Sequence, residues 1–487
     1  MNRPVDWMVL LPEMILCGGG VLVLMLDAIA PALRRAFTAI SLLTTLAAAW
    51  AVYWVTPDHT ATSAARTFAG LIETSPLTAA FSVVVLLSTA LCLLASQGYL
   101  RREKILSGEY HALLLWCATG LLLMLRATEL LTIFLSLELL SLCLYSLAAY
   151  HRRIALGGEA AIKYFLMGAF VSAFVLYGIA LVYGATGSTH LAEIGRALAA
   201  APRLPALASL GLLMLIAGFG FKMSIVPFHA WSPDTYQGAP SPFVAFLSVA
   251  PKVASALVLY RVLAAAVQNG AAVNVAKWST VVAILSVLSM VAGNLLALVQ
   301  RDIKRMLAYS GIAHMGYLLL ALVTLDRASL MPVLVYLLAY VLMNAGAFAV
   351  VAMLYSRPGE QHLISDLAGW GYRYPLLGGC LAVCMLSLGG IPPTAGFLGK
   401  YVVFLKAVGD GHVGLAVTGV LASLVGVFYY LRVIYVLYMK PETRQPEGLL
   451  IDVWGRAAAV LAALGTLALG LWPTGLLQWL ITATAAK

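Results

Sequence analysis

The stretch Gly218-Phe-Gly-Phe-Lys222-Met-Ser-Ile-Val-Pro227 places a lysine and a proline inside an apolar run over residues 207–228. A second stretch, Gly389-Gly-Ile-Pro-Pro-Thr-Ala-Gly-Phe-Leu-Gly-Lys400, does the same inside the run over 376–407. Proline removes a backbone donor, and consecutive prolines cannot continue a helix. Broken backbone at membrane depth persists only where it is buried in protein or faces a wet cavity. The two stretches therefore predict two broken transmembrane helices, each with a lysine beside its break.

The composition indicates that lipid is the solvent for most of the surface. Of the 487 residues, 62% are hydrophobic and 10% are charged, whereas a soluble domain carries roughly 25% charged residues. A soluble enzyme, a nucleic-acid-binding protein and a disordered scaffold are poor interpretations, because the charge to cover their surfaces is missing. The net charge of +10 comes mostly from short Lys/Arg clusters between apolar runs, which is typical of membrane topology.

Apolar runs of about 20 residues, enough to span a bilayer, recur along the whole chain. The runs lie near 7–29, 36–56, 76–97, 110–126, 128–149, 160–184, 207–228, 242–266, 275–299, 307–325, 330–355, 376–407, 412–438 and 454–482. We therefore expect an all-α polytopic membrane protein of about fourteen transmembrane helices, in one integral membrane domain over 1–487. Helices 7 and 12 are the broken ones.

The spacing of the two broken helices predicts an internal repeat, because they are five places apart in the helix order. Helices 4–8, over 110–266, make the first five-helix unit, and helices 9–13, over 275–438, make the second. An odd number of helices in each unit gives the two copies opposite orientations in the membrane.

Lysine and arginine are unevenly divided between the two sides of the predicted membrane. With the N-terminus outside, fourteen face the cytoplasm: Arg34, Arg35, Arg101, Arg102, Lys104, Arg152, Arg153, Arg301, Lys304, Arg305, Arg357, Arg373, Lys440 and Arg444. Eight face the other side: Arg3, Arg66, Arg126, Arg196, Arg203, Lys277, Arg327 and Lys487. This asymmetry predicts that both termini lie on the outer side, provided that the closely spaced runs 110–126 and 128–149 are two separate spans.

Ionisable side chains inside the predicted spans are the candidates for function. They are Glu138, Lys222, Lys252, His314 and Lys400. Each costs roughly 2.5–3.5 kcal/mol to place at mid-bilayer. An amine in a low-dielectric site favours its neutral form, and an imidazole can exchange a proton near neutral pH. A series of Glu, Lys and His therefore fits proton movement across the membrane, although a lone buried histidine is also compatible with a satisfied core residue.

Glu138 and Lys222 are expected to form an ion pair within the membrane, because each is otherwise an unpaired charge. Removing one partner of such a buried pair costs roughly 3–5 kcal/mol. Ser141 and Tyr145 lie on the same helix face as Glu138, so a purely structural carboxylate bonded to hydroxyls is the alternative.

Several further charged residues are candidates for accessory or structural roles rather than for the main proton path. Glu159 and Lys163 are four residues apart in the order that favours pairing, near the cytoplasmic end of helix 6. Together with His229 and Asp234 they are possible accessory residues. Arg126, between helices 4 and 5, is interpreted as an interfacial charge, and the role of Glu13 is left open.

Redox and metal chemistry have no sequence support in this chain. The six cysteines, Cys17, Cys92, Cys117, Cys143, Cys380 and Cys384, all lie in apolar runs, whereas a disulfide framework or metal site needs them at ligand spacing in polar loops. Nucleotide, phosphate-loop and haem motifs are missing from the sequence. We therefore expect no cofactor, no metal and no redox centre here, so that the energy for ion movement arrives through partner subunits.

The stretch Pro227-Phe-His-Ala-Trp-Ser-Pro-Asp234-Thr-Tyr-Gln-Gly-Ala-Pro-Ser-Pro242 resembles the signature of the antiporter-like membrane subunits of respiratory complex I. That family includes the large subunits of the multi-subunit sodium/proton antiporters. The resemblance covers nearly the whole chain and is highly specific for the family. The start, Pro12-Glu13-Met-Ile-Leu-Cys-Gly, the length and the lysine at position 400 resemble the N-subunit branch.

The resemblance implies a proton-translocating subunit of an NADH-quinone oxidoreductase in a bacterial inner membrane. It implies that Glu138 pairs with Lys222, and that Lys252 and Lys400 carry the proton onward. It also implies neighbouring antiporter-like subunits as partners, while NADH and quinone are used elsewhere in the complex. A sodium/proton antiporter subunit is the first alternative, and a structural membrane subunit without an ion path is the second.

Overall fold

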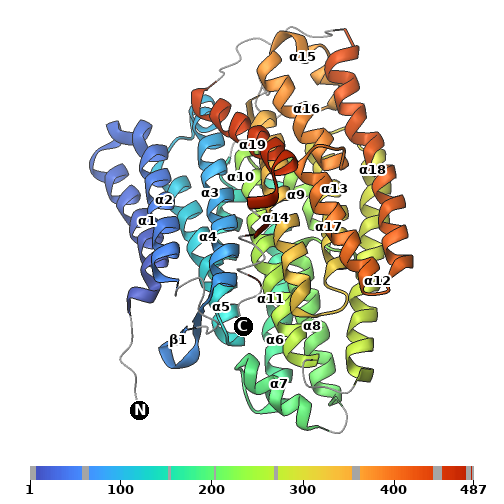
Figure 1. Ribbon diagram of the computed structural model, residues 1–487. Helices are drawn as coiled ribbons and strands as arrows, with labels where there is room; N and C mark the ends of the chain where they lie inside the picture. Colours follow the sequence, from blue (N-terminus) through green and yellow to red (C-terminus); the bar gives the residue numbers. More distant parts are fainter. Residues whose placement is uncertain are drawn as a thin grey trace.

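The computed structural model describes residues 7–56, 65–151, 155–201, 204–267, 272–353, 362–441, 452–475, 477–478 and 484. Figure 1 shows a bundle of long helices that run mostly in one direction. A short hairpin of β1 (Ala65–Thr67) and antiparallel β2 (Ile72–Thr74) lies at one end of the bundle. Of the charges used to predict the orientation, these lie outside the described residues: Arg3, Arg152, Arg153, Arg203, Arg357, Arg444 and Lys487.

The helices have the following bounds. Helices α1 to α7 cover Leu11–Ile29, Phe37–Val55, Pro76–Arg102, Gly108–Arg126, Leu130–Ala148, Ala155–Thr186 and Leu191–Ala200. Helices α8 to α13 cover Ala206–Met223, Trp231–Gly238, Ser241–Leu247, Ala250–Val267, Ala272–Leu298 and Ile303–Ala321. Helices α14 to α19 cover Leu330–Met353, Trp370–Arg373, Pro375–Gly389, Ala395–Gly409, Val413–Met439 and Val453–Leu471. Short 3-10 helices cover Trp7–Leu10, Pro31–Ala36, Phe68–Gly70, Arg327–Ser329 and Ile364–Leu367.

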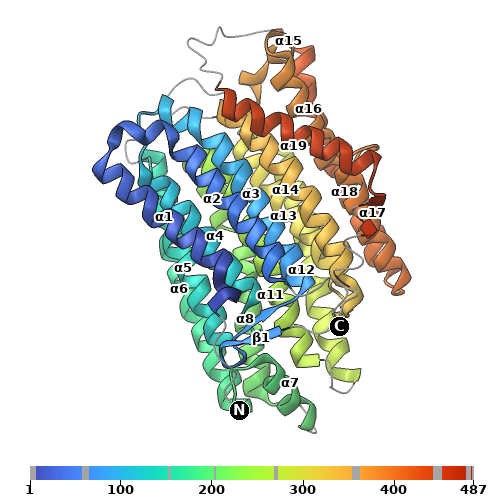
Figure 2. The same ribbon diagram turned by 60° about the vertical axis from the view of Figure 1, so that its left-hand side comes forward.

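The described residues contain twelve helical segments that are long and apolar enough to cross a membrane. Two further passes, α13 and the broken pair α16–α17, lie within the same bundle (Figures 1 and 2), which gives the fourteen passes expected. Nearly every residue of α13 is buried, so this helix carries more polar side chains than a lipid-facing helix can. Helices α4 and α5 are separate spans, joined only by residues 127–129.

The prediction that helices 7 and 12 are broken is confirmed. Helix α8 ends at Met223, followed by Ser224 at φ 60°, and the chain resumes as α9 at Trp231. Helix α16 ends at Gly389, followed by Gly390 at φ 81°, and α17 begins at Ala395. A residue in the left-handed region ends a helix by turning its backbone away from the helix axis. The prolines that follow then prevent the helix from resuming at once.

A third interruption, in helix 8, was not predicted. Helix α10 ends at Leu247 and α11 begins at Ala250. Pro251 supplies the physical reason, because its ring excludes the carbonyl of residue 247 from an ordinary helical hydrogen bond. Lys252 therefore stands in the first turn of α11, directly after a helix end.

Helices α11, α13 and α14 form the centre of the bundle, and almost all of their residues are buried. Helices α1 and α2 lie at one edge and α12 and α18 at the opposite edge (Figure 1), where many large apolar side chains are exposed. The polar residues of the three central helices are consequently surrounded by protein rather than lipid.

Candidate functional site

The structure brings four of the five main candidates, from Lys222 to Lys400, into one sequence of contacts, and Glu138 lies on the helix whose Ser141 binds Lys222. We call Glu138, Lys222, Lys252, His314 and Lys400 the central series. The last four are almost completely buried, with exposed fractions of 3%, 0%, 1% and 6%. Glu138 is only partly buried, on a helix whose neighbouring residues Leu135 and Leu139 are exposed.

Glu138 and Lys222 do not contact one another directly, so the prediction of a direct ion pair is wrong. The Glu138 carboxylate accepts a hydrogen bond from Ser172 of α6 at 2.5 Å. The Lys222 ammonium donates to Ser141 of α5 at 2.8 Å. Ser141 lies one turn after Glu138 on the same helix, so a single hydroxyl group separates the amine from the helix turn that carries the carboxylate.

Aromatic rings continue from Lys222 toward Lys252. The Lys222 amine lies 5.9 Å from the ring centre of Tyr164, and Tyr164 stacks on Trp231 of α9 at 4.6 Å. Trp231 contacts Tyr236 edge-on at 6.2 Å, and the Tyr236 ring lies 6.0 Å from the Lys252 amine. The faces of aromatic rings attract cations, so the rings stabilise charge on both amines without neutralising it.

Lys252 has no hydrogen-bond partner among the described residues, although its amine is fully buried. Its second ring contact is Tyr340 of α14, at 5.7 Å. The Tyr340 ring in turn lies 5.1 Å from the ring of His314. A buried amine without a fixed partner is the least restrained member of the central series, and buried polar atoms of this kind are normally satisfied by ordered water.

His314 uses both of its ring nitrogens. Nδ1 lies 2.6 Å from the hydroxyl of Tyr336 on α14, and Nε2 lies 3.1 Å from the hydroxyl of Tyr430 on α18. The Tyr430 hydroxyl also bonds to Ser310 at 2.5 Å. A neutral imidazole carries one donor and one acceptor nitrogen, so one tyrosine donates to the ring while the other accepts from it.

Lys400 of α17 binds the end of α16, on the other side of the second break. Its amine donates to the carbonyl oxygens of Leu388 and Gly389, each at 3.0 Å, and to Ser423 of α18 at 2.8 Å. The two carbonyls are the last of α16, which have no helical partner and carry the negative end of the helix dipole. The break therefore provides a ready site for a cation.

Three of the four accessory candidates form one network at the end of the bundle where α9 begins. The Lys163 amine binds Glu159 at 2.7 Å and Asp234 at 3.0 Å. Asp234 also accepts from Arg305 at 2.6 Å, which ties α6 and α9 to α13. His229 is in the same broken segment as Asp234 but is not one of the residues in these ion pairs.

The tyrosines around the central series were not predicted as part of the site. They are Tyr145, Tyr164, Tyr236, Tyr317, Tyr336, Tyr340 and Tyr430. The available signal was spacing, because Tyr336 and Tyr340 are four residues apart and so share one face of α14. The sequence places Lys304 in a cytoplasmic loop, but its amine is buried and donates to the carbonyl of Ala239 at 2.7 Å.

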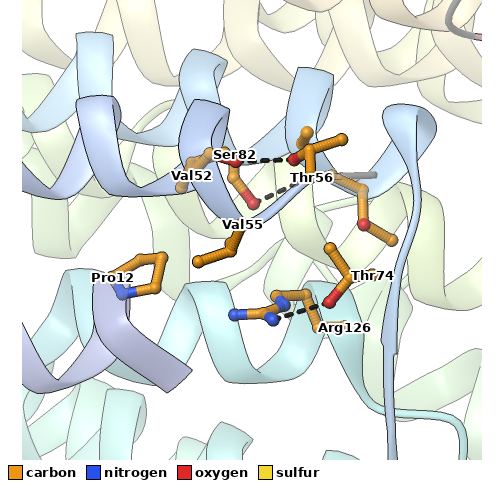
Figure 3. Close-up of a pocket in the computed structure, with 9 residues that line it drawn as sticks. Pro12, Val52, Val55, Thr56, Thr74, Ser82 and Arg126 are labelled. Atoms are coloured by element: carbon orange, nitrogen blue, oxygen red, sulfur yellow. Dashed lines mark hydrogen bonds between the residues drawn. The ribbon is translucent and has the colours of Figure 1, made fainter. Parts of the chain in front are cut away.

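Arg126, interpreted from the sequence as an interfacial charge, is buried within the protein. Its guanidinium makes two bonds to Glu13 of α1, at 2.6 and 2.8 Å, and further bonds to Val9 and Thr74. Figure 3 shows the small pocket beside it, which has room for about one water molecule. The pocket is lined by Pro12, Val52, Val55, Thr56, Thr74, Thr78, Ala79, Ser82 and Arg126. The pair fastens α1 to α4 and lies away from the central series.

Within the described parts of the chain, no group of three or more His, Cys, Asp or Glu side chains could bind a metal ion. The six cysteines are not joined in disulfides. The groups able to exchange protons are therefore the amines, the imidazole, the carboxylate and the hydroxyls described above.

Comparison with known proteins gives consistent matches over the whole chain. Residues 127–426 match the family model described as NADH:quinone oxidoreductase/Mrp antiporter, TM. The NADH-quinone oxidoreductase subunit N of Trichlorobacter lovleyi is 39% identical over 473 residues, which cover 97% of this chain and 95% of that protein. Subunit N of Myxococcus xanthus is 37% identical, covering 100% and 99% of the two chains.

Solved structures show the same fold. A chain of respiratory complex I from Thermus thermophilus is 35% identical with a TM-score of 0.80, covering 96% of this chain and 98% of that one. A chain of the Mrp complex from a Dietzia species has a TM-score of 0.82, covering 98% and 96%. At 20% identity, that second likeness concerns the fold alone.

Proposed function

The chain belongs to the antiporter-like membrane subunits of complex I, as a subunit N of NADH-quinone oxidoreductase, and we propose that its protons move along the central series. The order is Glu138, Lys222, Lys252, His314 and Lys400. The chain is a proton-pumping, multi-pass membrane subunit of a bacterial complex I, and it works together with other subunits of that complex.

The observation that carries the proposal is the unbroken succession of contacts from Lys222 to Lys400 through buried aromatic and imidazole groups. All but two of the steps join side chains on different helices, at ring-contact distance. The last link runs from His314 to the Tyr317 ring, which lies 5.2 Å from the Lys400 amine. Such a succession of ionisable groups in the membrane interior is costly, and it is the arrangement that proton transfer across a bilayer requires.

The two lysines at the broken helices are suited to accept and release a proton in turn. Lys222 lies at the C-terminal end of α8, and the Lys400 amine lies on the last carbonyls of α16. The carbonyl end of a helix favours a cation, whereas burial in low dielectric opposes one. A charge change at Glu138, one helix turn from the Ser141 that binds Lys222, would shift that balance.

We also propose that residues 110–266 and 275–438 are two inverted repeats. The element order supports this, since the fourth pass of each unit is broken, at α8–α9 and at α16–α17. In each unit the lysine beside the break donates to a serine of another helix.

The remaining features of the proposed function concern the setting of the chain. Its neighbours include further antiporter-like subunits, and the partly buried Glu138 supports contact with one of them on the side of α5. NADH and quinone are used by other subunits. The membrane is the bacterial inner membrane, with both termini on its outer side, as the Lys/Arg asymmetry indicates.

The test is to make Lys252→Ala and Lys400→Ala singly in the intact complex, reconstituted in proteoliposomes. Electron transfer from NADH to quinone and proton pumping are measured together. We expect fewer protons per electron in both variants, with electron transfer retained, because the redox centres lie in other subunits. Lys406→Ala, a change on α17 outside the central series, serves as the control. The proposal fails if both variants pump at the wild-type ratio.

A further inference from the structure

The second half of the central series contains a hydrogen-bonded chain that the sequence did not predict. Tyr336, His314 and Tyr430 come from α14, α13 and α18, and both ring nitrogens of the histidine are bonded to phenol hydroxyls. All three side chains are almost completely buried. An imidazole bonded in this way cannot rotate freely, so its two nitrogens face two different parts of the protein.

Tyr336 lies on the side of Lys252, and Tyr430 lies on the side of Lys400. Tyr336 is one turn from Tyr340 on α14, and the Tyr340 ring contacts the Lys252 amine. On the other side, the Tyr430 ring lies 3.7 Å from the position of a Cβ at Gly389. The carbonyl of Gly389 accepts a hydrogen bond from Lys400. The imidazole therefore lies between the surroundings of Lys252 and those of Lys400.

Gly311 leaves free space between the Lys252 amine and the Tyr340 hydroxyl, because it has no side chain. A Cβ at position 311 would lie 2.8 Å from the Lys252 amine and 2.8 Å from the Tyr340 hydroxyl. The Lys252 amine and the Tyr340 hydroxyl are therefore at most twice 2.8 Å apart. One water molecule between them could bond to both. Both are buried, and neither has a hydrogen-bond partner within the described part of the chain. Buried polar atoms are normally satisfied by protein or by ordered water.

We propose that the chain Tyr336–His314–Tyr430 carries the proton between Lys252 and Lys400, and that Gly311 keeps open the space in which a water connects Lys252 to the hydroxyl of Tyr340, one turn from Tyr336 on α14. This inference rests on the proposed function, because it needs the two lysines to be donor and acceptor. It adds two tyrosines and a glycine that act on the transfer step itself.

The transfer balances without leaving a charged phenol. The Lys252 ammonium gives up a proton and becomes a neutral amine, and that proton reaches the Tyr336 oxygen through water while the hydroxyl hydrogen of Tyr336 passes to Nδ1. The hydrogen on Nε2 leaves to the Tyr430 oxygen, whose own hydrogen passes through water to the Lys400 amine, since no direct bond between the two is among the described contacts. One positive charge has then moved from Lys252 to Lys400. The imidazole ends with its hydrogen on the other nitrogen, so it must return to its first tautomer before the next proton.

The experiment uses the intact complex in proteoliposomes, with Tyr336→Phe and Tyr430→Phe made singly. Each change removes one hydroxyl and keeps the ring. Tyr110→Phe is the matched control, because Tyr110 is equally buried but bonds to Ser96, at 2.9 Å, outside the central series. A group that transfers a proton typically accelerates the step by at least about 100-fold. We therefore expect the protons pumped per electron to fall in both variants to the value of Lys400→Ala, and to stay at the wild-type value in the control.

Two further measurements separate proton transfer from packing. Tyr430 replaced by 3,5-difluorotyrosine keeps the shape and the hydrogen bonds but makes the phenol more acidic, so the proton-to-electron ratio should begin to fall at a lower pH. A hydroxyl that only packs the core would not produce that change. Gly311→Ala removes no titratable group and should also lower the ratio, by occupying the space between Lys252 and Tyr340.

The outcomes distinguish this inference from the proposed function. If the tyrosine variants and Gly311→Ala pump normally while Lys252→Ala and Lys400→Ala do not, the tyrosine–histidine chain is wrong and the central series stands. If the lysine variants also pump normally, the proposed function itself is wrong. If a phenylalanine variant fails to assemble, the difluorotyrosine profile decides, and an unchanged profile overturns the inference.

Discussion

At the first broken helix the lysine lies before the break, and at the second it lies after the break. Lys222 belongs to the last turn of α8 and reaches one hydroxyl, that of Ser141. Lys400 belongs to α17 and reaches back to two backbone carbonyls of α16 and to Ser423. The first amine is therefore positioned by a side chain that can rotate, and the second by backbone that cannot.

The glycines beside the two breaks show the same difference. A Cβ at Gly220 would meet side-chain atoms of Ile225 and Phe228 at 3.0 Å. A Cβ at Gly396 would lie 1.8 Å from the backbone oxygen of Ser387. Side chains can move by a few tenths of an ångström, whereas two half-helices in backbone contact cannot. We infer that the first break tolerates adjustment and that the second break is rigid.

The largest expected difference between the breaks concerns these glycines. Gly396→Ala should destabilise the fold by about 3 kcal/mol or more, and Gly220→Ala by about 1 kcal/mol, since overpacking a close contact typically costs 1–3 kcal/mol. The measurement is the midpoint of thermal unfolding of the purified complex, followed by loss of this subunit on native gels. Equal destabilisation by both changes would remove the distinction between a rigid and an adjustable break.

The next effect concerns the serines that bind the two lysines. Ser141→Ala removes the hydroxyl bonded to the Lys222 amine, and an unsatisfied buried charge costs more than roughly 1–3 kcal/mol. Ser423→Ala leaves Lys400 with two carbonyl acceptors. We expect Ser141→Ala to lower the proton-to-electron ratio clearly and Ser423→Ala to lower it slightly. A larger loss in Ser423→Ala would show that the carbonyls do not fix Lys400.

The smallest effect concerns the ion-pair network at the end of the first broken helix. Asp234→Asn weakens the bonds that join α6 and α9 to α13 and should cost about 0.5–1 kcal/mol, the range of partly exposed ion pairs. Glu159→Gln removes only an exposed pair on α6, with side chains 45% and 59% exposed, and should leave the unfolding midpoint unchanged. The comparison is made at low salt and at high salt, because screening should reduce the effect of Asp234→Asn. A loss in Glu159→Gln as large as that in Asp234→Asn would contradict this ranking.

The sequence was sufficient to predict the breaks, because glycine and proline act locally on the backbone. It also identified each member of the central series, because a charge in an apolar run is costly wherever the helix points. It could not predict that Lys222 bonds to Ser141 while Glu138 bonds to Ser172. Both Glu138 and Ser141 lie on one polar face of α5, and which of them meets Lys222 depends on the tertiary packing of α5 against α6 and α8.

The tyrosines escaped prediction for a related reason. Tyrosine is common at membrane interfaces, so Tyr336 and Tyr430 could be recognised as partners of His314 only once three separate helices were in place. The pairing of Arg126 with Glu13 could not be predicted, because the two residues are 113 positions apart. Long-range pairs of this kind depend on tertiary packing and leave no local pattern in the sequence.

The most direct test of the central claim compares two fully buried histidines. His314 lies in the central series, whereas His111 of α4 bonds to Thr38 at 3.0 Å and to the carbonyl of Ser107 at 3.1 Å, outside that series. Protons pumped per electron are measured in proteoliposomes for the complexes with His314→Ala and with His111→Ala. We predict that the ratio falls in His314→Ala and stays at the wild-type value in His111→Ala, with electron transfer retained in both. A wild-type ratio in His314→Ala, or an equal fall in both variants, would contradict a proton path through the central series.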